Sequence, residues 1–123
     1  MKTIEDLQNL FPTIAELFAT EDHNIGESYV DENGISSDYE ENTFTYEEDG
    51  WLIEISYLCT GEWDRVSGGY WNPADRDLLR GWGEVTEIYA SHYDEESDED
   101  TEFSAENLTD LKTQINEILK ELA

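Results

Sequence analysis

The segment from Thr43 to Cys59 constrains the fold more than any other part of the chain. Aromatic and branched residues alternate with other residues on both sides of Glu48-Asp49-Gly50, and this period of two places them on one face of a strand. Asp49 and Gly50 supply the local hydrogen bonds and the positive φ of a tight turn. The pattern predicts a central antiparallel hairpin. Leu52 and Leu58 fall on the other face of its second strand, which predicts an inner strand covered in part on both sides.

Amphipathic patterns flank this hairpin. After Thr3, with Asp6 placed for a capping box, apolar residues recur at helical spacing as far as Phe18. Pro12 interrupts the stripe, which favours two short helical segments on one surface. Ser104 is expected to cap a final helix, in which Lys112 and Lys120 complement the helix dipole. The apolar stripe of that helix is Leu108, Leu111, Ile115, Ile118, Leu119 and Leu122.

The remaining segments give weaker signals. Residues 25–39 suggest a short hairpin, and residues 61–83 suggest a long structured loop with a helical turn at 74–79. Residues 84–93 have strand chemistry, and residues 94–100 form a hairpin tip before a partner strand at 101–103. The whole pattern predicts a single α+β domain over residues 1–123. We expect an antiparallel sheet of about four to six strands, with the N-terminal and C-terminal helices packed on one face.

Composition restricts the class of protein. Aromatic residues make up 12% of the 123 residues, which is too many for a disordered acidic tail. The single cysteine, Cys59, excludes an internal disulfide and suits a reducing compartment. No apolar run is long enough to span a bilayer, and the first ten residues lack the hydrophobic segment of a signal peptide. We therefore expect a cytoplasmic protein without membrane association.

The charge is the most unusual property of the sequence. Thirty-two Asp and Glu residues against six Lys and Arg residues give a net charge of -26. A compact protein of 14.2 kDa exposes roughly 6,800 Å², or about one net charge per 260 Å², against about one per 110 Å² on duplex DNA. Such a chain repels nucleic acids and attracts basic proteins. Direct nucleic-acid binding is not expected, and a basic nucleic-acid-binding protein is the expected partner.

Carboxylates spaced along a folded body can occupy a groove built for phosphates. We therefore predict a nucleic-acid mimic that acts as an inhibitor or decoy. In composition the chain resembles phage and mobile-element anti-defence proteins, which are short, acidic and without catalytic motifs. Solubility and a high-salt environment are alternative explanations of the acidity. The candidate contacts are Asp94, Glu95, Glu96, Asp98, Glu99, Asp100 and Glu102, followed by Asp38, Glu40, Glu41, Glu47, Glu48 and Asp49.

A second hypothesis is a protein-interaction module built on residues 61–83. Trp, Tyr and Arg are the residues enriched at interface hot spots. The same residues would also form a local core in which each arginine pairs with a nearby carboxylate. The residues concerned are Trp63, Arg65, Tyr70, Trp71, Arg76, Arg80 and Trp82.

Catalysis and metal binding have less support. No nucleophile elbow, phosphate-binding loop or zinc-protease motif is present, so we expect no enzyme activity, catalytic residue or cofactor. Residues 31–34 look like the opening of a calcium loop, but the later ligands do not fall at the required spacing. His23, His92 and Cys59 are isolated from one another, which gives no support to zinc. A weak calcium-binding module is the third hypothesis, without a dedicated metal site.

Overall fold

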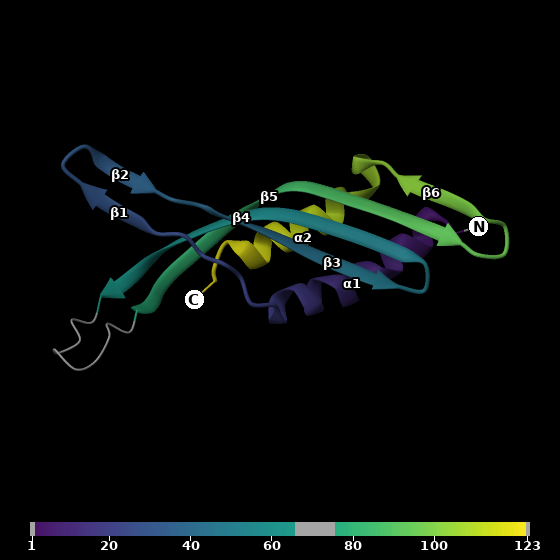
Figure 1. The fold of residues 1–123 in the computed structure, drawn as a ribbon, viewed down its shortest axis with the longest axis horizontal. Helices are drawn as coiled ribbons and strands as arrows, with labels where there is room; N and C mark the ends of the chain where they lie inside the picture. Colours follow the sequence, from purple (N-terminus) through teal and green to yellow (C-terminus); the bar gives the residue numbers. More distant parts are fainter. Residues whose placement is uncertain (1, 66–75, 123) are drawn as a thin grey trace.

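The structure is a computed structural model that describes residues 2–65 and 76–122. Two helices flank a series of strands (Figure 1). In chain order the elements are α1 (Ile4–Thr20), β1 (Ser28–Asp31), β2 (Gly34–Ser37), β3 (Glu40–Glu48), β4 (Trp51–Arg65), β5 (Arg76–Asp94), β6 (Glu99–Phe103), the 3-10 helix η1 (Ala105–Leu108) and α2 (Thr109–Leu119).

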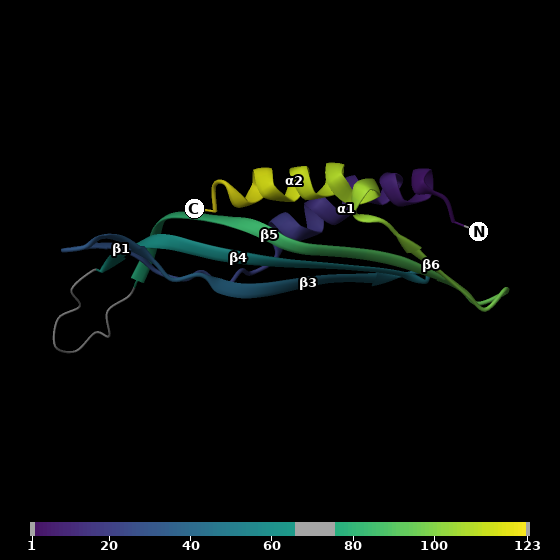
Figure 2. The same ribbon diagram turned by 90° about the horizontal axis from the view of Figure 1, so that it is seen from above.

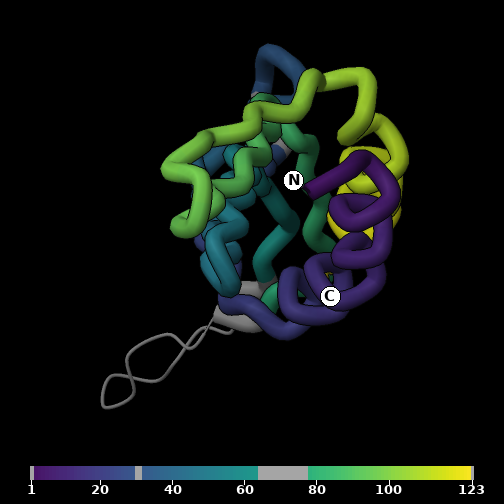
Figure 3. The backbone as a smooth tube through the Cα atoms, turned by 90° about the vertical axis from the view of Figure 1, so that its right-hand side faces the viewer, coloured from purple at the N-terminus to yellow at the C-terminus, as the bar shows by residue number. Residues whose placement is uncertain are grey.

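The strands form a four-stranded antiparallel sheet in the order β3-β4-β5-β6 and a two-stranded sheet of β1 and β2. Both helices lie on one face of the four-stranded sheet (Figure 2). Viewed from the end, the sheet and the helix pair form two layers (Figure 3). The α+β class, the number of strands and the placement of both terminal helices on one face are confirmed.

The core lies between these layers. Leu7, Phe11, Ile14 and Phe18 of α1 and Leu111, Ile115 and Leu119 of α2 are buried against the helix-facing side of the sheet. That side is supplied by the alternating residues of the predicted hairpin, including Phe44, Ile53, Ile55 and Tyr57, all of which are buried. Phe18 makes edge-to-face contacts with Phe44 and Tyr57, at ring-centroid distances of 5.5 and 4.8 Å. The period-two pattern therefore identified the buried face of β3 and β4.

The N-terminal helix begins as the sequence predicts. Thr3 is its N-cap, and Thr3 and Asp6 form a capping box. The division into two segments at Pro12 is wrong, because α1 runs unbroken through it. Proline inside a helix costs about 3 kcal/mol. Burial of Phe11, Ile14 and Phe18 on the same helical face offsets that cost, while Pro12 itself is exposed.

The hairpin between β3 and β4 has the predicted turn, with Asp49 and Gly50 at φ of 52° and 85°. The prediction of a loop over residues 61–83 is wrong in its described parts. Residues 61–65 continue β4, and residues 76–83 belong to β5, so there is no helical turn at 76–79. Residues 66–75 lie outside the described residues.

Two glycines of β5 lie where the C-terminal end of the chain approaches the sheet closely. A Cβ on Gly83 would lie 2.5 Å from the backbone oxygen of Leu58 and 3.3 Å from a methyl group of Leu119. A Cβ on Gly81 would lie 3.0 Å from the side chain of Leu122. The glycines therefore allow the end of the chain to pack closely on the sheet.

Two further differences concern capping and coverage. The Ser104 side chain makes no capping hydrogen bond, and it precedes η1 while α2 begins at Thr109. β4 is an inner strand as predicted, but no described helix covers its second face, where Leu52 and Leu58 are half-buried (Figure 2). The weak signal at residues 25–39 is confirmed as the hairpin of β1 and β2.

The molecule is elongated, and it exposes 8513 Å² rather than the roughly 6,800 Å² expected of a compact protein. The average area per net charge is accordingly about 330 Å². Among the described residues, no helix is long and apolar enough to cross a membrane.

Candidate partner-binding surface

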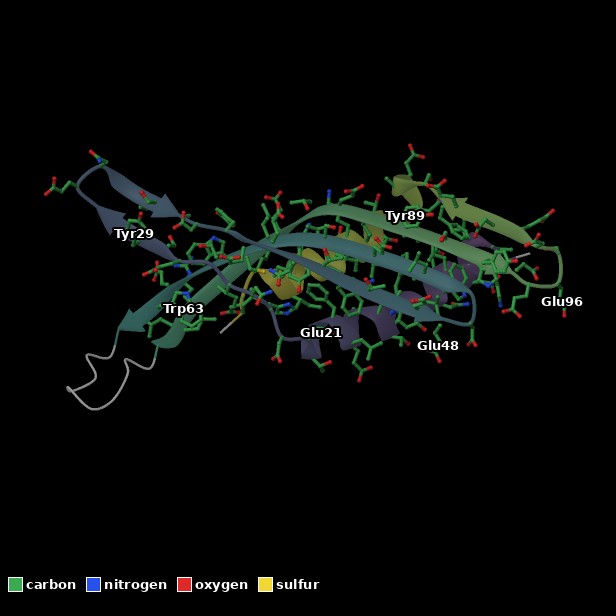
Figure 4. The ribbon with its side chains drawn as sticks, viewed as in Figure 1. Glu21, Tyr29, Glu48, Trp63, Tyr89 and Glu96 are labelled. Carbon is green, nitrogen blue, oxygen red and sulfur yellow. The ribbon has the colours of Figure 1, made fainter. Side chains whose placement is uncertain are left out.

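The turns β3–β4 and β5–β6 lie side by side at one end of the sheet. The backbone N–H of Tyr93 donates to the Gly50 carbonyl at 2.8 Å, and His92 Nε2 lies 3.1 Å from the Asp49 carbonyl oxygen. Glu48 and Glu96 mark the two turns in Figure 4. The structure thus brings together two of the predicted acidic groups, residues 47–49 and 94–100, which we call the acidic tip.

The acidic tip has a defined shape. The Glu96 backbone N–H donates to Asp94 Oδ1 at 3.0 Å, which holds the pKa of Asp94 below its ordinary value. The Tyr93 hydroxyl donates to the Asp98 carboxylate, and this bond raises the pKa of Tyr93. A shallow hollow of about 380 Å³ lies between the turns, lined by Asp49, Gly50, His92, Tyr93, Asp94, Glu95 and Glu96.

Buried rings anchor the acidic tip to the core. His92 is 7% exposed and its ring meets Trp51 at a centroid distance of 4.8 Å, while Trp51 stacks on Phe103 at 5.5 Å. Each of these three residues comes from a different strand. The two acidic turns are therefore both attached to one cluster of packed aromatic rings.

The other predicted contacts lie elsewhere. Glu40 and Glu41 are exposed at the opposite end of β3, about 20 Å from Glu47 at the usual rise per residue of a strand, and the exposed Asp38 precedes this strand. Glu102 lies in β6, beyond the turn. The two candidate clusters of the sequence are therefore not two separate sites, because the second is divided between the two ends of the sheet.

The face that joins these ends was not predicted from the sequence. Outward-facing side chains of β3–β6 form a surface that no described element covers, and we call it the open sheet face (Figure 2). Its residues are Glu41, Thr43, Thr45, Glu47, Leu52, Glu54, Ser56, Leu58, Glu84, Glu87, Tyr89, Ser91, Asp100 and Glu102.

The carboxylates on the open sheet face are spaced apart by the strand register. Glu54 lies opposite Thr45 and Tyr89, Glu87 lies opposite Ser56, and Glu41 lies opposite Leu58. The same holds for Glu47 opposite Leu52, Glu84 opposite Leu58, Glu102 opposite Ser91 and Asp100 opposite Tyr93. Like charges directly opposite each other destabilise a sheet, and this arrangement avoids them.

One signal for this face was present in the sequence. Leu52, Glu54, Ser56 and Leu58 alternate with the buried row of β4. In β5 the alternation is broken by a bulge at Thr86, whose hydroxyl donates to the Ser56 carbonyl at 3.1 Å. The bulge shifts the period by one residue, and this shift explains why the inward face of residues 84–93 could not be assigned from the pattern.

The stretches of chain that carry this surface contain no positive charge. Residues 3–64 and 81–111 contain no lysine or arginine. Lys112 and Lys120 are exposed on α2, in the helix layer, and Lys120 Nζ lies 2.6 Å from Glu117 Oε1. Over residues 41–58 and 84–102 the open sheet face and the acidic tip therefore carry carboxylates and no cation, and the exposed Arg80 of β5 lies opposite Glu62 beyond the end of this surface.

The described residues of the alternative interaction loop have internal partners. Trp63 is half-buried and its Nε1–H donates to the Gly26 carbonyl at 2.8 Å, at the end of the molecule far from the acidic tip (Figure 4). The Arg80 guanidinium lies 5.2 Å from the ring centroid of Trp82, a cation–π distance. Tyr70 and Trp71, and the side chains of Arg65 and Arg76, lie outside the described residues.

Metal-ligating and nucleophilic side chains are dispersed over the described part of the chain. Within residues 2–65 and 76–122, no three His, Cys, Asp or Glu side chains converge to hold an ion. Burial raises the pKa of the Cys59 thiol to about 11, so this cysteine is a buried apolar group near neutral pH. His23 Nδ1 lies 2.5 Å from the Tyr57 hydroxyl, and burial lowers the pKa of His23.

Comparison with known proteins adds no relative. No protein-family model, no curated protein and no solved structure matches this chain.

Proposed function

We propose that this protein binds a basic, nucleic-acid-binding protein through its carboxylates and blocks the groove that the partner uses for phosphates. The observation that carries the proposal is a sheet face with two adjoining turns that bear many carboxylates and no cation. The open sheet face and the acidic tip lie on segments without a single lysine or arginine, while Lys112 and Lys120 lie on the helix layer. Within the described residues these carboxylates have no Lys or Arg side chain beside them, so they remain available to an external cation.

A solvated coat that serves solubility alone is the competing explanation. Such a coat needs negative charge but no large continuous surface from which cations are excluded. Self-repulsion among 26 net charges also works against folding, so we expect so large a charge to serve binding. The role is therefore that of an inhibitor or decoy, of the kind found in phage or mobile elements, acting inside the cell.

The test is an affinity capture from nuclease-treated lysate of the source cells, carried out at two salt concentrations. We expect nucleic-acid-binding proteins to be retained near 0.15 M salt and released near 1 M, as the Debye length falls from about 8 to 3 Å. Added duplex DNA or structured RNA should compete for the captured protein. Partners that are not basic, or that nucleic acid does not displace, would refute the proposed function.

A further inference from the structure

The open sheet face carries apolar side chains as well as carboxylates. Leu52, Leu58 and Tyr89 lie on it half-buried, although no described element packs against it. Tyr89, Glu54, Glu87 and Ser56 line a hollow of about 320 Å³ on the two central strands. A solvated face of an antiparallel sheet is usually polar, so an apolar centre within a carboxylate surface is suited to a contact.

The width of the open sheet face limits the size of the structural element that can bind to it. Four strands at about 4.8 Å spacing give a strip roughly 15–20 Å wide, and an α-helix with its side chains is about 10–12 Å in diameter. One helix along the centre of the strip would cover Leu52, Leu58 and Tyr89 and leave the outer strands within reach of long side chains. Sheets pack against helices by such face contacts, as this sheet already does on its other side.

The spacing of the carboxylates suits a cationic helix. Carboxylates on diagonal positions of neighbouring strands lie about 7–8 Å apart at the backbone. Lysine and arginine residues three or four positions apart on a helix lie about 5–6 Å apart, and their flexible stems can span the difference. An arginine above the ring of Tyr89 would also gain a cation–π contact while it pairs with Glu54 or Glu87.

We infer that the open sheet face is the docking site for an amphipathic, Lys/Arg-rich α-helix of the partner, with Glu54, Glu87 and Tyr89 at its centre. This inference rests on the proposed function and adds to it both the surface and the element of the partner that binds there. The acidic tip differs from this face, because Asp94 and Glu99 lie directly opposite each other and its turns carry no leucine. The tip would steer the approach of a cation and would not form the central contact.

The test uses the full chain and a Lys/Arg-rich amphipathic helical peptide of about 20 residues, which matches the roughly 30 Å length of β3. A scrambled peptide of the same composition is the second probe. The variant Glu54→Gln with Glu87→Gln should weaken binding of the amphipathic peptide about tenfold at low salt. The control variant, Glu16→Gln with Glu121→Gln, has the same net charge and alters exposed carboxylates of the helix layer and C-terminus, so it should change binding less than about threefold.

Amide chemical shifts of the full chain provide the second measurement. Perturbations at Leu52–Leu58 and Glu87–Ser91 support the inference. Perturbations confined to residues 47–49 and 94–100, equal losses for both variants or equal binding of the scrambled peptide would overturn it. The proposed function would survive that result if nucleic-acid-binding proteins were still captured in a salt-dependent manner, and it would fail separately if none were.

Discussion

Asn42 offers the sharpest test of how the chain is held together. Its side chain is 9% exposed and joins the segment after α1 to the edge of the sheet. Asn42 Oδ1 accepts from the Asn24 backbone N–H at 2.7 Å, and its Nδ2 donates to the carbonyls of Asn24 at 2.8 Å and of Glu40 at 3.1 Å. The substitution Asn42→Ala therefore removes three hydrogen bonds at once.

The size of the effect follows from these bonds. A buried hydrogen bond contributes about 1 kcal/mol net, and Asn24 is exposed enough for water to replace part of the loss. We therefore expect Asn42→Ala to lower the free energy of unfolding by about 2–3 kcal/mol. For a chain of this length the entropy of unfolding is about 0.26 kcal/mol per kelvin, so the melting temperature should fall by about 10 °C.

Thermal unfolding followed by far-UV circular dichroism, at fixed salt, measures this change. Asn107→Ala is the matched control, because the Asn107 side chain makes no hydrogen bond to another described residue and its loss should change stability by less than about 0.5 kcal/mol. If Asn42→Ala lowered the melting temperature no more than Asn107→Ala, the bonds to Asn24 would contribute nothing to the stability of this junction.

Three further predictions concern charge, reactivity and pH. Raising neutral salt from about 0.01 to 0.15 M should raise the melting temperature by screening repulsion among the carboxylates, and no rise would mean that the fold already compensates them. Cys59, with a pKa raised to about 11, should react with a thiol reagent at pH 8 only as fast as the protein unfolds, so immediate labelling would contradict its burial. Burial lowers the pKa of His23, so the unfolded chain binds more protons and this residue makes stability fall as pH drops through 6.5. His23→Gln should remove that part of the slope between pH 6.5 and the folded-state pKa, and an unchanged slope would assign it to other groups.

Local sequence patterns were sufficient to predict the elements whose buried residues repeat with the period of the strand or helix. The alternation around Asp49-Gly50 predicted the hairpin of β3 and β4, and the stripe from Leu111 to Leu119 predicted α2. Thr3 and Asp6 predicted a capping box because both partners lie within four residues. In each case the relevant contact is close in sequence or repeats with the period of one element.

Contacts between distant segments account for the failures. Residues 61–83 were predicted to form a loop, yet Gly81 and Gly83 are strand residues that make room for Leu122 and Leu119, which lie nearly forty positions later. Pro12 suggested a break, but packing of Phe18 against the sheet keeps α1 continuous. Neither contact can be recognised from the neighbouring residues in the sequence. Local propensities therefore predicted the wrong secondary structure at both places.

The candidate surface was only partly predictable for the same reason. The acidic turns are evident in the sequence, but their proximity depends on the register between β4 and β5, which sets His92 opposite Trp51. The carboxylates Glu54 and Glu87 are single residues within strands, and the bulge at Thr86 conceals the face that they share. A charge count detects acidity, whereas the position of each carboxylate requires the register.

The fold suggests how so acidic a chain stays folded. The carboxylates of the open sheet face each lie opposite an uncharged residue, so repulsion within the sheet is reduced without any internal cation. The remaining repulsion is relieved when cations approach from outside. A ligand that binds only the folded state stabilises it by RT ln(1 + [L]/Kd), about 2.7 kcal/mol at a hundred times Kd. A basic partner should therefore raise the melting temperature by more than simple salt of equal ionic strength, because screening acts on all charges whereas docking pairs specific ones.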